Sequence, residues 1–291
     1  MVKLNRTTNI KEILGTNKHI DKNIRIKLKK RIEKQIKKSI TQIAFDRYFS
    51  KKYAIYRKQA KLIILQSQKM IRNINQNPKL KTAQLLFIDR DAIPFMQTMK
   101  ILEQKQGNNE HIFGNVLFSD KLFKDYIKFV GIASIIKQKS PGIQLISKYI
   151  EQLENAPEFK EYKTQKTIKN IDPSKPIIII DSGIVGSHLK INEAMLNYIF
   201  PNTKIYTGLF YHNRLSKNTV DFTIAENKVN TVFKQFAIKQ AELEKIPKFE
   251  NKLESIKNGE TIRTNKREPQ NPISAKIFAI ALGNELLKYT K

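Results

Sequence analysis

The stretch PIIIIDSGIVGSHLK, residues 176–190, decides how this chain folds. Four isoleucines after a proline predict a short buried strand that ends at Asp181. Gly183 and Gly186 permit a tight turn with exposed backbone N–H groups, and Ser187 is a suitable N-cap for the amphipathic segment that follows. A free helix N-terminus beside a hydroxyl and a carboxylate is typical of a seat for a phosphorylated ligand. An ordinary strand-to-helix turn capped by Asp181 is the other interpretation.

Strands and helices alternate around this stretch. The apolar runs at residues 83–88 and 114–118 predict buried strands, and helical periodicity covers residues 95–105, 121–138 and 142–154. A further strand, richer in Thr and Tyr, is expected at 203–211. Because Ile and Leu run almost continuously through the apolar strands, the pattern favours a mostly parallel sheet covered by helices, which is an α/β fold.

Polar residues at the strand ends are the candidates for chemistry, because ligands of such sheets bind beyond the carboxyl ends of the strands. All three acidic turns should converge on one edge of one sheet. The candidates are Asp89, Arg90 and Asp91 after the first strand, Ser119 after the second, and Asp181, Ser182, Gly183, Gly186 and Ser187 after the third.

The Asp and Arg residues among these candidates are of types that commonly bind phosphorylated ligands or their metal ions. Asp181 can hold Mg²⁺ or accept hydrogen bonds from sugar hydroxyls, and Asp89 is a second candidate ligand for the metal. The guanidinium of Arg90 can bind a phosphate bidentately. Neutralisation of Asp89 and Asp91 by Arg90 is the alternative role.

Residues 83–212 resemble the type I phosphoribosyltransferases. The segment IIIIDSGIVGS resembles their ribose-phosphate loop, and LLFIDRDAIPF looks like their pyrophosphate loop, in the same order along the chain. The resemblance implies a phosphorylated ribose or nucleotide ligand, bound with Mg²⁺, with Asp181, Asp91 and Asp89 at the centre of the site. One departure is that Ser182 stands where the family has its second acid.

The segment LLFIDRDAI is also similar to the first motif of the haloacid-dehalogenase superfamily of phosphatases. That resemblance implies that Asp89 is a nucleophile and Asp91 a general acid. Ser119 would then bind phosphate, and Asp181 would coordinate Mg²⁺. Ala92, Ile93 and Pro94 depart from the usual pattern of that family.

Composition sets the outer bounds of function. The 291 residues carry a net charge of +28 and no cysteine, which excludes disulfides and Cys-based metal sites and fits a cytoplasmic location. No apolar run is long enough to predict a membrane span. Lys, Asn and Ile are frequent throughout, so AT-biased coding is an alternative origin of the basicity.

The positive charge is concentrated at the N-terminal end, where residues 1–81 hold a net charge of +19 and the remaining 210 residues hold +9. Apolar residues recur every four positions over 23–45, which predicts one amphipathic helix, and a second helix is expected over 47–74. Cations interleaved with tyrosines can neutralise phosphates while the rings stack on bases, so RNA or DNA is a candidate partner. Packing of the tyrosines in the core is the alternative. The candidate nucleic-acid contacts are Lys29, Lys30, Arg31, Lys34, Lys51, Lys52, Arg57 and Lys58.

We therefore expect three parts: a basic helical segment (1–81), an α/β phosphate-binding core (82–222) and a helical tail that packs on the core (223–291). Three functions remain open at this point. They are a phosphoribosyltransferase-like protein, a phosphatase, and a basic nucleic-acid-binding protein whose α/β part is a scaffold.

Overall fold

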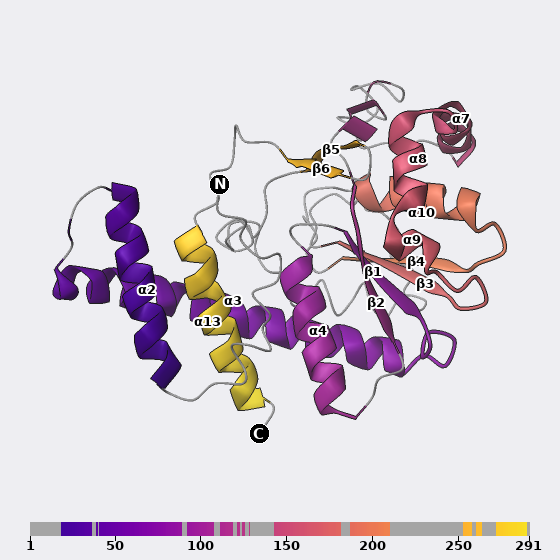
Figure 1. Ribbon diagram of the computed structural model, residues 1–291. Coiled ribbons are helices and arrows are strands. Elements are labelled where there is room, and N and C mark those ends of the chain that lie inside the picture. Colours follow the sequence, from indigo (N-terminus) through magenta and orange to yellow (C-terminus); the bar gives the residue numbers. More distant parts are fainter. Residues whose placement is uncertain are drawn as a thin grey trace.

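The computed structural model describes residues 19–36, 39, 41–88, 92–107, 111–118, 121–122, 124–125, 128, 143–181, 187–209, 253–257, 260–263 and 272–289 (Figure 1). Helices and strands alternate through most of these ranges. Their bounds are α2 His19–Ile36, α3 Gln42–Asn75, β1 Gln84–Ile88, α4 Ile93–Lys105, β2 Ile112–Val116, α7 Ile143–Leu153, α8 Pro157–Thr164, α9 Lys166–Lys169, β3 Ile177–Asp181, α10 Ser187–Ile199, β4 Ile205–Leu209, β5 Leu253–Lys257, β6 Glu260–Arg263 and α13 Pro272–Tyr289.

Strands β1 to β4 form one sheet in the order β2-β1-β3-β4, and every neighbouring pair is parallel. Ile88 of β1 pairs with Val116 of β2, and Asp181 of β3 pairs with Leu209 of β4. The predicted α/β class with a parallel sheet is confirmed. The strands all end at the same edge because they are parallel and in register.

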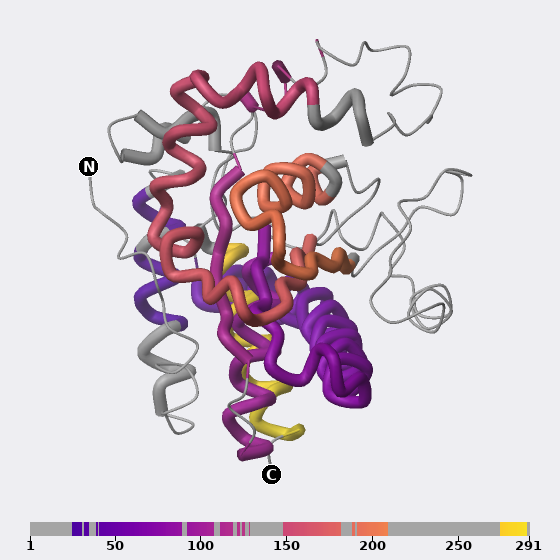
Figure 2. The backbone as a smooth tube through the Cα atoms, turned by 90° about the vertical axis from the view of Figure 1, so that its right-hand side faces the viewer, coloured from indigo at the N-terminus to yellow at the C-terminus, as the bar shows by residue number. Residues whose placement is uncertain are grey.

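Helices cover both faces of the sheet (Figure 1). Alternate residues of β1 enter different cores: Phe87 packs with α3, α4 and α13, whereas Ile88 packs with α7, α8 and α10. Figure 2 looks at the molecule from the side of α7 and α10, with α10 in front of the sheet. Both faces of the central strands are therefore buried away from solvent, which explains why four successive isoleucines occur in β3.

The order of the strands creates a topological switch point between β1 and β3. The connection from β1 to β2 runs through α4 on one face, and the connection from β3 to β4 runs through α10 on the other. The two crossovers leave in opposite directions from neighbouring strands. A crevice at the carboxyl edge is the usual consequence, and it is where open α/β sheets bind their ligands.

The N-terminal residues depart from one detail of the sequence prediction. A single helix over 23–45 is wrong, because α2 ends at Ile36 and α3 begins at Gln42. Thr41 has an extended backbone, and its Oγ1 accepts a hydrogen bond from the N–H of Ala44 at 3.3 Å. Threonine in this conformation is a favourable N-cap, so it starts a new helix inside a stretch whose apolar periodicity continues.

The C-terminal residues also differ from the prediction of a wholly helical tail. Residues 253–257 and 260–263 form the antiparallel strands β5 and β6, in which Lys257 pairs with Glu260. Asn-Gly at 258–259 is a strong signal for a two-residue hairpin, and it was overlooked within a polar segment. Residues 225–246 of the predicted helical tail and most of the helix predicted over 121–138 lie outside the described residues.

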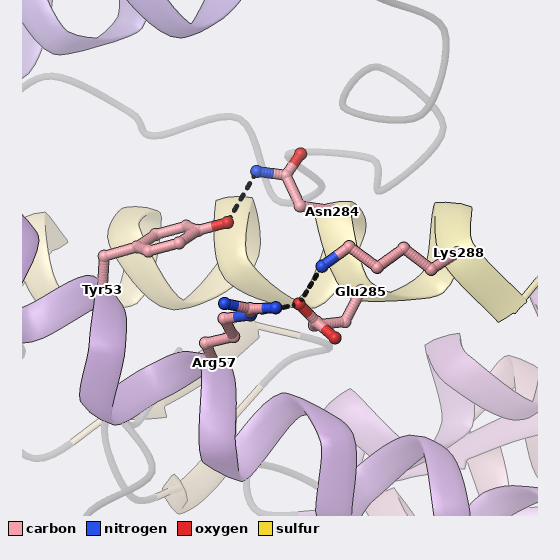
Figure 3. A network of polar contacts seen from close by, with 5 residues as sticks. All are labelled: Tyr53, Arg57, Asn284, Glu285 and Lys288. Carbon is pink, nitrogen blue, oxygen red and sulfur yellow. Dashed lines mark hydrogen bonds and ion pairs between the residues drawn. The ribbon is translucent and has the colours of Figure 1, made fainter.

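The last helix, α13, packs on α3 and shares its core. A polar network borders this contact (Figure 3): Nε of Arg57 donates to Oε1 of Glu285 at 2.6 Å, and Nζ of Lys288 donates to the same oxygen at 2.7 Å. Nδ2 of Asn284 donates to the hydroxyl of Tyr53 at 2.9 Å. Glu285 is buried, whereas Arg57 and Lys288 are about half exposed. The network therefore stabilises a carboxylate that packing alone would disfavour.

The pKa of Glu285 makes this network sensitive to acid. Burial opposes the charged form, but the hydrogen bonds from Lys288 and Arg57 outweigh it and lower the pKa below the ordinary 4.5. A lowered carboxyl pKa stabilises the fold above the ordinary value, and this stabilisation is lost as pH falls through the lowered one. At neutral pH we expect Glu285→Gln to reduce the free energy of unfolding by about 1–2 kcal/mol, a range limited by the half-exposed partners.

The check is urea denaturation of both proteins at neutral pH and at about pH 3. The difference between wild type and Glu285→Gln should shrink at low pH, whereas the exposed Glu151→Gln should leave stability unchanged at both. A difference that stays constant across this range would contradict the assignment.

Candidate functional site

The candidate site lies at the carboxyl edge of the sheet, at the switch point. Phe87 pairs with Ile180, so β1 and β3 end side by side, with Ile88 and Asp181 as their last residues. Asp181 is partly exposed, whereas the other four residues of β3 are buried. The predicted convergence of β1, β2 and β3 on one edge of one sheet is confirmed.

Most of the predicted site residues follow directly from these strand ends. The described residues include Asp181, at the end of β3, and the backbone of Ser187, which opens α10. The side chain of Ser187 and the remaining candidates lie outside the described residues, namely Asp89, Arg90, Asp91, Ser119, Ser182, Gly183 and Gly186. Their places along the chain nevertheless fix the strand end from which each one starts. Residues 89–91 follow β1, and residues 182–186 join β3 to α10.

The first turn of α10 is held by buried polar contacts. Nδ2 of Asn192 donates to the carbonyl of His188 at 2.7 Å, and the hydroxyl of Tyr162 donates to Oδ1 of the same Asn192 at 2.9 Å. Tyr162 and Asn192 are fully buried, and burial raises the pKa of Tyr162 far above its ordinary value. The neutral hydroxyl therefore remains a donor at every working pH. The ring of His188 also lies 5.1 Å from that of Phe118, measured between centroids.

The segment after β2 is held in a similar way. The side-chain amide of Gln165 donates to the carbonyl of Leu117 and accepts from its N–H, both at 2.7 Å. Next along the strand, Oγ1 of Thr167 donates to the carbonyl of Asn115 at 2.7 Å. A Cβ at Gly114 would lie only 2.5 Å from Cγ2 of Thr167, so glycine lets α9 approach this closely. Ser119 follows this anchored segment by two residues.

Sequence reasoning overlooked these supporting residues. Gln165 stands 48 positions from Leu117, and Tyr162 stands 30 positions from Asn192. Neither pair forms a local sequence motif. The only usable signal was a polar residue inside an otherwise apolar helical face, as Asn192 is in α10.

The predicted nucleic-acid contacts have different environments. Arg57 is engaged by Glu285, and the side chain of Arg31 lies outside the described residues. The others are exposed or partly exposed cations on α2 and α3: Lys29, Lys30, Lys34, Lys51, Lys52 and Lys58.

The tyrosines of α3 serve the core, as the alternative interpretation held. Tyr56 is buried with its ring edge-on to Phe278, and Tyr53 stacks on Phe49 at 5.8 Å between centroids. Tyr48 is partly buried against the same cluster. This packing favours the alternative interpretation, in which the rings contribute to the core, over stacking on bases.

The described residues also bear on the predictions of a metal ligand and of no membrane span. Within those ranges, no three His, Asp or Glu side chains gather as a metal site would require. The same part of the chain contains no helix with the length and apolar character needed to cross a membrane.

The sequence matches no protein-family model, and it has no significant match among curated proteins.

Proposed function

We propose that the carboxyl edge between β1 and β3 binds a phosphorylated ribose with Mg²⁺, in the manner of a type I phosphoribosyltransferase. The observation that carries the proposal is the parallel pairing of β1 with β3 at a switch point. Because of this pairing, the two segments that resemble phosphate-binding loops, 89–91 and 182–186, follow from neighbouring strand ends. Sheets of this kind bind ligands at that position.

Each part of the ligand has a candidate partner on the chain. Backbone N–H groups of residues 182–186 and of the start of α10 would bind the ribose phosphate, since a helix N-terminus attracts anions. The carboxylate of Asp181 would accept hydrogen bonds from the ribose hydroxyls. Arg90 would bind the pyrophosphate oxygens bidentately, with Asp89 and Asp91 beside it.

Mg²⁺ fits the donors of this edge. Asp181 is a partly exposed carboxylate, and carboxylate oxygen is the ligand type that Mg²⁺ prefers. Asp181 and Asp89 would hold the ion, whose charge would balance that of the pyrophosphate. The hydrogen bonds from Tyr162 to Asn192 and from Gln165 to Leu117 would then hold the first turn of α10 and the end of β2 in place while the ligand binds.

Binding is tested by thermal unfolding with phosphoribosyl pyrophosphate and MgCl₂. Ligand at a hundred times its dissociation constant adds about 2.7 kcal/mol to the stability of the folded state, which corresponds to roughly 4–5 °C in Tm for a chain of this size. We expect a shift of that order for the wild type and none for Asp181→Asn. Asp172→Asn is the matched control, because Asp172 lies before β3 at the opposite edge and its carboxylate binds Ser174.

The control and the variant separate the possible outcomes. A shift that survives in Asp181→Asn would contradict the role of this carboxylate. A wild type that shows no shift, but hydrolyses a generic phosphate ester until Asp89 is replaced by Asn, would replace the proposal with the phosphatase function.

A further inference from the structure

The face of α3 that points away from the core carries a regular ladder of cations. The buried residues Phe45, Phe49, Tyr56, Ile63 and Ile74 define the inner face. Opposite them, at helical spacing, stand Arg47, Lys51, Lys58, Lys61, Lys69 and Arg72. We refer to these six residues as the outer ladder. Five of them are exposed, and Lys69 is partly exposed.

The outer ladder has no acidic residue in its own segment. Residues 47–88 contain neither Asp nor Glu, and the single acid of α3, Asp46, lies near the N-terminal end of the helix and accepts hydrogen bonds from Gln42. Within the described ranges, the ladder residues Arg47, Lys51, Lys58, Lys61 and Arg72 form no ion pair. Arg57, which lies on the side facing α13, is the contrast, because Glu285 neutralises it.

The ladder consists of three like-charged pairs. Arg47 with Lys51, Lys58 with Lys61, and Lys69 with Arg72 are neighbours on the helix surface, at spacings of four, three and three residues. Such pairs cost about 0.2–0.5 kcal/mol each in an isolated helix. Loss of hydration and the charge of Arg72 both lower the pKa of Lys69. Within the described ranges, no ion pair at Arg47, Lys51, Lys58, Lys61 or Arg72 offsets this repulsion.

The spacing of the pairs points to a polyanion of uniform charge density. The first residues of the pairs, Arg47, Lys58 and Lys69, recur every 11 residues, or about 16.5 Å along the helix axis. In a duplex, each strand crosses a line parallel to the axis once per turn of about 34 Å, so the two strands supply one crossing every ~17 Å on average. The ladder spans 25 residue steps, or ~38 Å, which is close to one duplex turn.

Two other polyanionic partners fit less well. Single-stranded nucleic acid is usually held by aromatic stacking, and the tyrosines of α3 are packed in the core instead. An anionic membrane requires an apolar face, and the exposed large apolar side chains of α3 are only Ile43, Ile55 and Leu65. We therefore propose that the outer ladder of α3 binds the phosphate backbone of a nucleic-acid duplex, without reading its sequence.

The test is fluorescence anisotropy of the full chain with mixed-sequence DNA and RNA duplexes of about two helical turns. Six phosphate contacts predict a loss of roughly 10³-fold in affinity between 50 and 200 mM salt. Replacing the middle pair with Lys58→Gln and Lys61→Gln should lower the salt slope by about 2 and weaken binding roughly 10- to 100-fold near 100 mM salt. Whichever duplex binds more tightly shows whether the preferred partner is DNA or RNA.

The matched control removes the same charge from the other side of the sheet. Lys160→Gln with Lys169→Gln changes two exposed lysines on α8 and α9, and it should leave the slope nearly unchanged. If both double variants weakened duplex binding equally, the effect would come from net charge alone, and the proposal would be overturned. Tighter binding to a single strand, or stronger binding to vesicles of anionic phospholipid than to either duplex, would also overturn it.

Discussion

Replacing Phe278 with alanine is expected to reduce the free energy of unfolding by about 3–5 kcal/mol, because it removes a fully buried aromatic ring and leaves a cavity in the core. The ring lies edge-on to Tyr56, 5.9 Å away between centroids. It belongs to the cluster that joins α3, α13 and the inner face of β1 and β3. Equilibrium denaturation in urea measures the loss.

The control lies on the same helix. Tyr289 is 46% exposed near the end of α13, so Tyr289→Ala should change stability by no more than about 0.5 kcal/mol. A small effect of Phe278→Ala, similar to that of the control, would mean that α13 does not share the core of the sheet. It would also remove the support for the contact between Arg57 and Glu285.

The second large effect is expected at a buried pair remote from the candidate site. His111 and Glu103 are both buried, and Nδ1 of the imidazole contacts Oε1 of the carboxylate. Nε2 lies 3.3 Å from the carbonyl of Leu80, so both ring nitrogens face acceptors. The pair ties the end of α4 and the start of β2 to the turn before β1.

His111→Leu should therefore reduce the free energy of unfolding by about 3–5 kcal/mol, because it leaves a buried carboxylate without its partner. Replacing both residues, with Glu103→Leu added, should recover part of that loss, since two apolar side chains leave no buried polar group without its partner. Denaturation of the three proteins under one buffer condition measures both effects. A double variant less stable than His111→Leu alone would contradict the importance of this pairing.

Much of the α/β core was predictable because its elements have local signals. The isoleucine run of β3, the apolar run of β1 and the periodicity of α10 each follow from a few neighbouring residues. The edge on which the strand ends converge also followed, since alternating strands and helices favour a parallel sheet. The break between α2 and α3 was missed because the apolar period continues past the Thr41 cap.

The supports of the candidate site could not be predicted, because their partners are far apart in the chain. Gln165 reaches the backbone of Leu117 because α9 packs beside β2 in the folded chain. Asn192 needs the hydroxyl of Tyr162 from another helix. Sequence alone shows that such residues are polar, but it does not show which backbone groups they will reach.

By itself, the sequence determined which segments become strands and helices and where acids and glycines follow the strands, since both depend on short-range periodicity and turn chemistry. Only the tertiary structure decided that β1 lies next to β3, that the tyrosines of α3 face inward, and that Arg57 meets Glu285 across 228 residues. These choices depend on which apolar faces bury each other. That long-range competition leaves the outer ladder of α3 facing solvent and brings the ends of β1 and β3 side by side.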